Sequence, residues 1–315
     1  MSQTITPSEV KLKMLSGGEI AILDIREEGV FATGHLLFAR NVPLSRLELL
    51  INDLVPRKGT PIILCGEGDE MTEVGSARLN SLGYNQVIIL EGGINNWTNT
   101  GNLLFGGVFV PSKAFGEFVE ATYHPPFITP EELQWKLKAK EDVLVLDSRP
   151  LAEYRRACIP EAIDTPGAEL VYRIHDLIQT PETLVVVTCA GRTRSIIGGQ
   201  SLINAGIANK VVVLKNGTMG WHLAGMELEH GQDRRAKFPS RNGLEKARAC
   251  SARVAQRFGV RTIDRTLLET WHKETDHHSL YLLDVRSPEE YCAGHLYGSI
   301  SSPGGQLVQA TDKYI

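Results

Sequence analysis

The sequence has 315 residues, which is long for a single hydrophobic core and favours two or three domains. Hydrophobic residues make up 42% and charged residues 22%, and the formal net charge of -4 gives no reason to expect nucleic acid as a partner. We expect neither a membrane span nor a signal peptide, because no apolar run is long enough and the first residues lack a basic and an apolar segment.

The N-terminal part of the chain begins with a helix-start signal, in which Thr6 is followed by Pro7. An apolar stretch over residues 21–26 ends in the pattern Asp-x-Arg, and another ends at Cys65. A glycine-rich segment with Trp97 lies 32 residues after that cysteine. Short apolar strands that alternate with helical stretches predict a parallel sheet with helices on both faces.

The same order of features recurs in the middle of the chain. A helix start at Thr129 precedes an apolar strand over residues 143–149, which ends in Asp-Ser-Arg. A β-branched strand then ends at Cys189, and Trp221 again lies 32 residues after the cysteine. The middle part is therefore a second copy of the α/β unit.

A third copy begins near the weaker helix start at Thr262 and has its Asp-x-Arg strand at residues 281–286. In all three copies a proline follows the aspartate by 19 residues: Pro43, Pro166 and Pro303. The cysteine strand of the third copy would lie beyond Ile315. We therefore expect the chain to be part of a longer tandem protein, with a degenerate third copy as the alternative.

These features divide the chain into three copies and two linkers: 1–105 (a first domain), 106–126 (a linker), 127–228 (a second domain), 229–260 (a linker) and 261–315 (a partial third copy). Both linkers contain a predicted helix, over residues 111–123 and 242–258.

The stretch around Cys189 carries the chemistry. A buried parallel strand ends at this cysteine, where α/β proteins place reactive groups. The next helix start, its free N–H groups and the guanidiniums of Arg192 and Arg194 should favour a thiolate over a thiol. Ser195 is expected to cap the helix. This pattern indicates a nucleophile beside an anionic substrate.

A strand that ends in cysteine, a six-residue loop that closes with Arg194 and a glycine-rich tryptophan motif resemble the rhodanese (sulfurtransferase) family. The resemblance implies tandem rhodanese-like domains in which Cys189 takes a sulfane sulfur, holds it as a persulfide and passes it to an acceptor. It also implies that the loop after the catalytic cysteine binds the donor, through Ala190, Gly191, Arg192, Thr193, Arg194 and Ser195.

Three residues near the site are expected to be structural. Asp147 and Arg149 have counterparts in the other two copies, which favours a scaffold role, and Trp221 belongs to the turn motif of the family. The second copy departs from the other two at Cys158, where they have a histidine. That thiol is either buried filler or a second redox group.

The first copy is expected to be inactive, because its loop carries Glu67, Asp69 and Glu70 where the second copy has arginines. Carboxylates at these positions would repel an anionic donor and disfavour a thiolate at Cys65.

Two other functions are alternatives to a sulfurtransferase. Dual-specificity-type phosphatases need an arginine six positions after the cysteine, where this chain has Ser195. A non-catalytic persulfide carrier or docking module would suit the first and third copies.

The resemblance implies a small anionic donor, namely thiosulfate, a mercapto-acid or a persulfide, and a thiol, cyanide or protein acceptor. It implies no cofactor, and the sequence is compatible with a homo-oligomer. Five scattered cysteines form neither a disulfide framework nor a metal site and are typical of a reducing cytoplasm.

Overall fold

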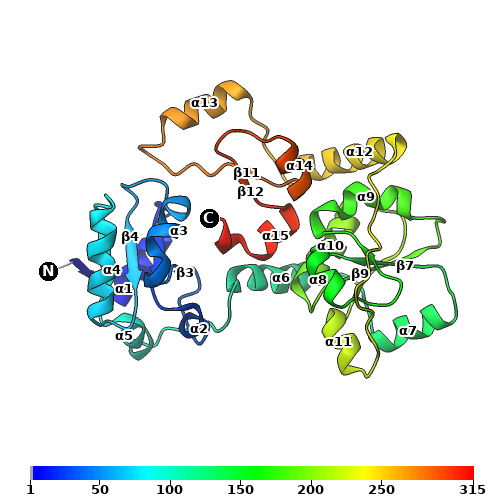
Figure 1. The fold of residues 1–315 in the computed structure, drawn as a ribbon, viewed down its shortest axis with the longest axis horizontal. Coiled ribbons are helices and arrows are strands. Elements are labelled where there is room, and N and C mark those ends of the chain that lie inside the picture. Colours follow the sequence, from blue (N-terminus) through cyan, green and yellow to red (C-terminus); the bar gives the residue numbers. More distant parts are fainter. Residues whose placement is uncertain (1–2) are drawn as a thin grey trace.

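The computed structural model describes residues 3–315, which form two five-stranded parallel sheets and one two-stranded parallel sheet (Figure 1). The strand order is β1-β5-β4-β2-β3 in the first sheet and β6-β10-β9-β7-β8 in the second. The two orders are the same when each strand is replaced by its counterpart in the other copy. The predicted tandem α/β architecture is therefore confirmed.

The first unit contains β1 (Gln3–Ile5), α1 (Pro7–Leu15), β2 (Ala21–Asp24), α2 (Glu28–Phe31), β3 (Arg40–Asn41), η1 (Leu44–Arg46), α3 (Leu47–Leu54), β4 (Ile62–Cys65), α4 (Glu70–Ser81), β5 (Val87–Leu90) and α5 (Gly93–Asn99). The second unit contains β6 (Phe127–Ile128), α7 (Pro130–Lys138), β7 (Val143–Asp147), α8 (Leu151–Arg156), β8 (Ile163–Asp164), η2 (Gly167–Glu169), α9 (Leu170–Leu177), β9 (Leu184–Thr188), α10 (Thr193–Asn204), β10 (Val211–Leu214) and α11 (Gly217–Leu223).

The central strands β4 and β9 are buried because helices cover both faces of each sheet. On one face of the second sheet, buried apolar side chains cluster with Val186 and Trp221. On the other face, they cluster with Val185 and Val187. Strands that are apolar throughout require such two-sided cover. The structure thus explains why these segments read as continuous apolar runs.

The predicted helix starts at Thr6 and Thr129 are confirmed, and each threonine forms a reciprocal capping box with a glutamate three residues later. The predicted start at Thr262 is wrong by two residues. Asp264 caps α13 (Arg265–Lys273) instead, because its carboxylate accepts the N–H of Leu267 at 2.8 Å.

Two linker helices pack against the second unit. Helix α6 (Val110–Tyr123) lies between the two five-stranded units and packs on α10, and α12 (Arg241–Arg257) packs on α9 (Figure 1). The approach of α6 to α10 is close, since a Cβ added to Gly116 would lie 3.0 Å from Cγ2 of Thr193. Both predicted linker helices are therefore confirmed to within one residue at each end.

The third unit contains α13, β11 (Leu283–Asp284), α14 (Pro288–Ala293), β12 (Ile300–Ser301), α15 (Gly304–Gln309) and η3 (Thr311–Lys313). Figure 1 shows its red C-terminal part between the two larger units and its orange helix α13 at the top of the view. The Tyr281 hydroxyl donates to the Leu54 carbonyl at 2.7 Å in the first unit.

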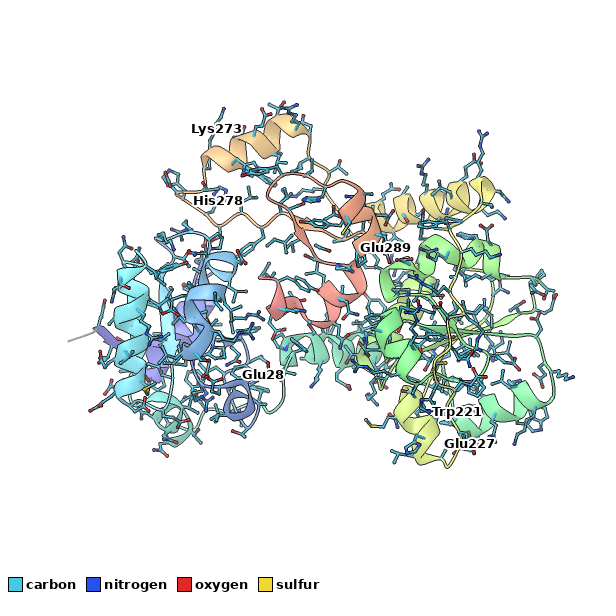
Figure 2. The ribbon with its side chains drawn as sticks, in the orientation of Figure 1. Glu28, Trp221, Glu227, Lys273, His278 and Glu289 are labelled. Carbon is cyan, nitrogen blue, oxygen red and sulfur yellow. The ribbon has the colours of Figure 1, made fainter. Side chains whose placement is uncertain are left out.

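The third unit meets the second at two short glycine-containing turns. A Cβ added to Gly304 would lie 2.9 Å from Cβ of Ala168, and one added to Gly305 would lie 3.1 Å from N of Gly167. Glu289 of α14 (labelled in Figure 2) lies 3.9 Å from the guanidinium of Arg235, in the linker that follows the second unit. In the described part of the chain, no helix is long and apolar enough to cross a membrane.

Candidate active site

Cys189 follows β9 directly, at the carboxyl end of the central strand of the second sheet. Only 2% of the residue is exposed. A short loop leads from it to α10, so the thiol lies at the sheet edge where α/β folds usually place their ligands.

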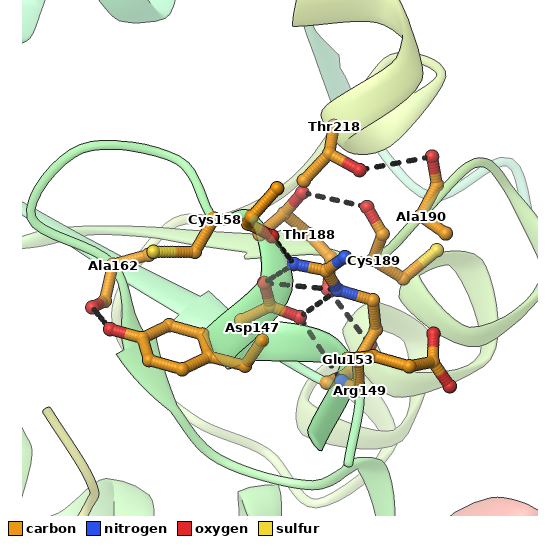
Figure 3. A network of polar contacts seen from close by, with 12 residues as sticks. Asp147, Arg149, Glu153, Cys158, Ala162, Thr188, Cys189, Ala190 and Thr218 are labelled. Carbon is orange, nitrogen blue, oxygen red and sulfur yellow. Dashed lines mark hydrogen bonds and ion pairs between the residues drawn. The ribbon is translucent and has the colours of Figure 1, made fainter. Parts of the chain in front are cut away.

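The start of the loop after Cys189 is held by hydrogen bonds that its carbonyl groups accept from α11. The N–H groups of Thr218 and Met219 on α11 donate to the carbonyls of Cys189 and Ala190 at 2.9 and 3.0 Å, and Figure 3 shows Thr218 beside Ala190. Within residues 3–315, no carbonyl or side-chain oxygen accepts a hydrogen bond from the N–H groups of residues 190–195. These N–H groups are therefore available to a bound anion.

Gly217 permits this docking of α11 on the loop. Its φ is +55°, and an added Cβ would lie 2.2 Å from the Cys189 carbonyl oxygen. A side chain at this position would push α11 and the loop apart.

Ser195 contacts the thiol but does not cap the helix, so that prediction is wrong. Helix α10 already begins at Thr193, and the Ser195 hydroxyl donates back to the Arg192 carbonyl at 3.0 Å. The Cys189 Sγ lies 3.3 Å from the same Ser195 Oγ. The loop is shorter than the sequence suggested, and this brings Ser195 over the sulfur.

Arg194 closes the loop through a two-pronged ion pair. Its two Nη atoms donate to the two carboxylate oxygens of Glu153 on α8, each at 2.7 Å. Burial raises the pKa of Glu153, but hydrogen bonds and charge from Arg194 outweigh burial and bring that pKa below its ordinary value. Glu153 is therefore the ion-pair partner of Arg194 and lies outside the Asp147–Arg149 pair.

Arg192 points to the linker helix and not to the thiol. Its Nε and Nη2 donate to the Glu117 carboxylate at 3.0 and 2.9 Å, and Nη2 also contacts the Glu120 carboxylate. Sequence reasoning missed both glutamates. They are more than 70 residues away from the loop, in a segment that has no motif of its own.

Asp147 and Arg149 form a buried ion pair at the end of β7 (Figure 3). Arg149 Nε and Nη2 donate to the Asp147 carboxylate at 2.9 and 2.6 Å, and Nη2 also donates to the Ala157 carbonyl at 2.6 Å. The pairs in the other copies have the same geometry: Arg26 with Asp24 and the Gly34 carbonyl, and Arg286 with Asp284 and the Gly294 carbonyl. Each pair ties the end of a strand to the loop after the next helix.

Arg149 also belongs to the electrostatic surroundings of the thiol. Burial lowers the pKa of Arg149, but the hydrogen bonds and charge of Asp147, with the nearby charges of Glu153 and Cys189, raise it overall. The guanidinium thus stays charged close to Cys189.

Trp221 is structural in its contacts. The indole is buried in the core, and its N–H donates to the Glu227 carbonyl at 2.8 Å, beside which it lies in Figure 2.

Cys65 occupies the matching position in the first unit, at the end of β4. It is fully buried, and burial followed by the charge of Asp24 raises its pKa, against the opposite effect of Arg26. Two of the loop carboxylates have other partners: Glu67 pairs with Arg26 at 3.2 Å, and Asp69 caps α4. The thiolate is disfavoured as expected, but burial is the main cause.

Cys158 lies in the core beside Tyr154, and burial raises its pKa. In the first unit the same place is taken by His35, which stacks on Phe31 with ring centroids 3.8 Å apart. No group of three or more metal-ligating side chains is found among residues 3–315.

Comparisons with known proteins agree with this geometry. A family model described as the rhodanese-like domain matches residues 6–100 and 129–224. The crystal structure of thiosulfate sulfurtransferase from Pseudomonas aeruginosa superposes with a TM-score of 0.96 and is 51% identical over 99% of this chain. This chain covers 59% of the length of that protein.

Two curated relatives match shorter stretches. An uncharacterized protein of Bacillus subtilis is 32% identical over 76 residues, which is 24% of this chain and 59% of the relative. An HTH-type transcriptional regulator of Mycobacterium tuberculosis is 35% identical over 104 residues, which is 33% of this chain and 45% of the relative. The chain thus spans less than two thirds of each of these three proteins.

Proposed function

Because the chain belongs to the rhodanese-like domain family, we propose that it is a sulfurtransferase whose second domain carries sulfur as a persulfide on Cys189. The likeness to thiosulfate sulfurtransferase from P. aeruginosa supports this activity. The donor is a small anionic sulfur compound, and the acceptor is a thiol, cyanide or a protein.

The reaction needs a thiolate as the nucleophile and hydrogen-bond donors that stabilise the negative charge of the persulfide. The Cys189 thiolate attacks the sulfane sulfur of thiosulfate, the bond between the two donor sulfurs breaks, and sulfite leaves with the electron pair. A persulfide anion remains on Cys189, and the acceptor removes its outer sulfur. The unshared N–H groups of residues 190–195 are the observation that carries this proposal, because they suit a monoanionic terminal sulfur.

The size of the loop supports sulfur over phosphate as the group transferred. The ring from Cys189 closes with Arg194, and the next position holds Ser195, whose hydroxyl lies 3.3 Å from the thiol. A phosphatase of the dual-specificity type would need a guanidinium at that position.

The domains have separate roles in this proposal. Residues 1–105 form a non-catalytic domain, because burial and the charge of Asp24 raise the pKa of Cys65 and the loop after it has no arginine. Residues 127–228 form the catalytic domain, 106–126 and 229–260 are linkers, and 261–315 form a partial third repeat. Five free thiols support a cytoplasmic location.

Mass spectrometry of the intact protein tests the proposal. After incubation with thiosulfate, the protein should gain one sulfur atom, and cyanide should remove it with release of thiocyanate. No gain of mass with thiosulfate, a mercapto-acid or glutathione persulfide would reject the proposal. Hydrolysis of a phosphate ester by the same sample would favour the phosphatase.

A further inference from the structure

The linker helix α6 contributes two carboxylates to the loop after Cys189. Glu117 and Glu120 are three residues apart and therefore share one face of α6. Glu117 holds the Arg192 guanidinium through two hydrogen bonds, at 3.0 and 2.9 Å, and Glu120 contacts the same Nη2. The mid-loop arginine is thus bound from outside the catalytic domain.

Helix α6 is held firmly enough to keep these carboxylates in place. Val119 packs in a buried cluster with Ile196 of α10, and Gly116 lies against Thr193 at the start of the same helix. On another part of α6, the Ser112 hydroxyl accepts the N–H of Thr311 from the third unit at 3.3 Å. The position of the two glutamates is therefore set by both neighbouring units.

The guanidiniums near the thiol are all paired with carboxylates. Arg149 pairs with Asp147 and Arg194 with Glu153, and the side chains of these arginines are 6% and 8% exposed. Arg192 differs because its side chain is 40% exposed. Of these three guanidiniums, Arg192 is the most accessible to a donor entering from solvent, and two carboxylates compete with the donor for it.

We propose that Glu117 and Glu120 determine donor specificity by withholding the Arg192 guanidinium, so that dianionic donors such as thiosulfate are disfavoured relative to monoanionic ones. This inference rests on the proposed sulfurtransferase function. A dianion gains more than a monoanion from a free guanidinium and loses more when that guanidinium is already neutralised. The linker, and not only the loop, thereby sets the preferred donor charge.

The experiment compares thiosulfate with methanethiosulfonate, a monoanion that delivers its sulfane sulfur by the same displacement and releases methanesulfinate. The full chain is assayed by thiocyanate formation for wild type, the Glu117→Gln/Glu120→Gln variant and a Glu245→Gln control. Glu245 forms an exposed pair with Arg241 on α12, at 3.2 Å. We expect the kcat/KM ratio of thiosulfate to methanethiosulfonate to rise about threefold to fivefold in the double variant only, through KM.

A second comparison separates withholding of Arg192 from simple repulsion. In an Arg192→Gln background, the two Glu→Gln changes should leave the donor ratio unaltered. The same rise in that background would mean that the glutamates act on the donor by charge alone, and it would overturn the proposal. An unaltered ratio in the double variant with Arg192 present would also overturn it.

Binding without turnover keeps this inference distinct from the proposed function. In a Cys189→Ser background, calorimetry should show tighter thiosulfate binding when Glu117 and Glu120 are glutamines. Wild-type protein that moves no sulfur would reject the sulfurtransferase, whereas unaltered thiosulfate affinity would reject the role of the glutamates.

Discussion

Cys65 and Cys189 end equivalent strands and are both shielded from solvent, yet their surroundings differ. Beside Cys65, Asp24 adds to the effect of burial in raising the thiol pKa. Beside Cys189 lie the Ser195 hydroxyl, the charged Arg149 and the unshared N–H groups of the loop. A thiolate is the nucleophilic form of cysteine, so the raised pKa of Cys65 disfavours sulfur chemistry at the first site, and we place that chemistry at Cys189 in the proposed function.

Cys189→Ser should therefore abolish persulfide formation, with a loss of more than about a thousandfold in the transfer rate. Cys65→Ser should leave the rate within about twofold of wild type, because no step passes through that thiol. Thiosulfate-to-cyanide assays and intact mass measure both effects. Activity that survives in the Cys189 variant and disappears in the Cys65 variant would reverse the assignment of domains.

Arg194→Ala should lower kcat/KM by about tenfold or more, because it removes a charge-assisted, two-pronged contact that closes the loop. Circular dichroism and the assay should be run together, with Arg241→Ala as a control at a fully solvated arginine. If both variants behaved alike, Arg194 would have no special role at the site.

Asp164 predicts a pH-dependent stability. Burial, with the charges of Asp147 and Glu169, raises its pKa from 3.8 to about 7, against the opposite effects of Arg235 and Arg149. One carboxylate oxygen, Oδ1, has no hydrogen-bond partner within the described residues. Because the folded state holds the proton more tightly than the unfolded state, stability should be highest below pH 4 for this group and should fall as the pH rises through 7.

Asp164→Asn removes this penalty, so it should stabilise the protein at pH 8.5 much more than at pH 4. The gain is on the order of a few kcal/mol, since one pKa unit corresponds to about 1.4 kcal/mol. Urea unfolding of both proteins at the two pH values measures the difference. Equal differences at the two pH values would show that Asp164 titrates normally.

At the scale of single residues, short-range patterns were predictable and long-range partners were not. Cys189 and Arg194 stand out because a strand, a loop and a helix follow one another in the sequence. The partner of Arg194 on α8 is 41 residues away, and the partners of Arg192 on α6 are 72 and 75 residues away. Only the packing of whole helices determines which glutamates meet those arginines.

At the scale of secondary structure elements, the start of α11 holds the loop after Cys189 in place. Gly217→Ala should lower transfer activity by about a hundredfold, because the added Cβ would displace the Cys189 carbonyl and the loop with it. Gly225→Ala is the matched control, since Gly225 also has a positive φ but an added Cβ would contact nothing within 4 Å.

Gly225→Ala should cost about 1 kcal/mol of stability and leave the kcat/KM of the folded protein unaltered. Equal losses of activity in the two variants would mean that backbone strain, and not contact with the loop, is responsible. Thermal unfolding and the sulfur-transfer assay distinguish these outcomes.

The helix ends show where local sequence rules hold. The Thr-Pro starts of α1 and α7 were predictable because the cap and its glutamate are within four residues of each other. Thr262 misled because Asp264, two residues later, caps the helix, and Ser195 misled because α10 begins two residues earlier, at Thr193. At α10 the first turn begins at Thr193 with no side-chain cap, since packing against α6 and β9 decides where the helix begins.

At the scale of the whole molecule, the third unit is weakly built. Its strands β11 and β12 have two residues each, and none of the residues in α13, α14 or α15 is buried. Its ordering depends on contacts with the first and second units. Local stability follows the burial of apolar side chains, so this unit should open most readily.

Hydrogen exchange tests this with a matched pair of strands. Strands β8 and β12 are both two residues long and both lie at the edge of a parallel sheet, but β8 belongs to a sheet of five strands. The amides of β12 should exchange at least about tenfold faster than those of β8. Equal protection in both would mean that the third unit is as stable as the second.

The repetition of motifs predicted the two sheets and their common topology. It did not predict how the units are arranged, because no pattern in the sequence links positions as distant as Tyr281 and Leu54, which are 227 residues apart. Such contacts depend on surfaces that several elements build together.

The two glycine-containing turns between the second and third units have a further consequence. Gly167 and Gly304 occupy equivalent positions, one after the common proline, and so do Ala168 and Gly305. Gly304 lies against Ala168, and Gly305 lies against Gly167. Two identical subunits make reciprocal contacts of this kind across a twofold axis. One polypeptide thus contains a pseudo-dimer, and the covalent connection keeps each half bound to its own neighbour. A change that detached the third unit would therefore expose the turn at Gly167 and Ala168 on the second unit, where one half of this symmetric contact lies.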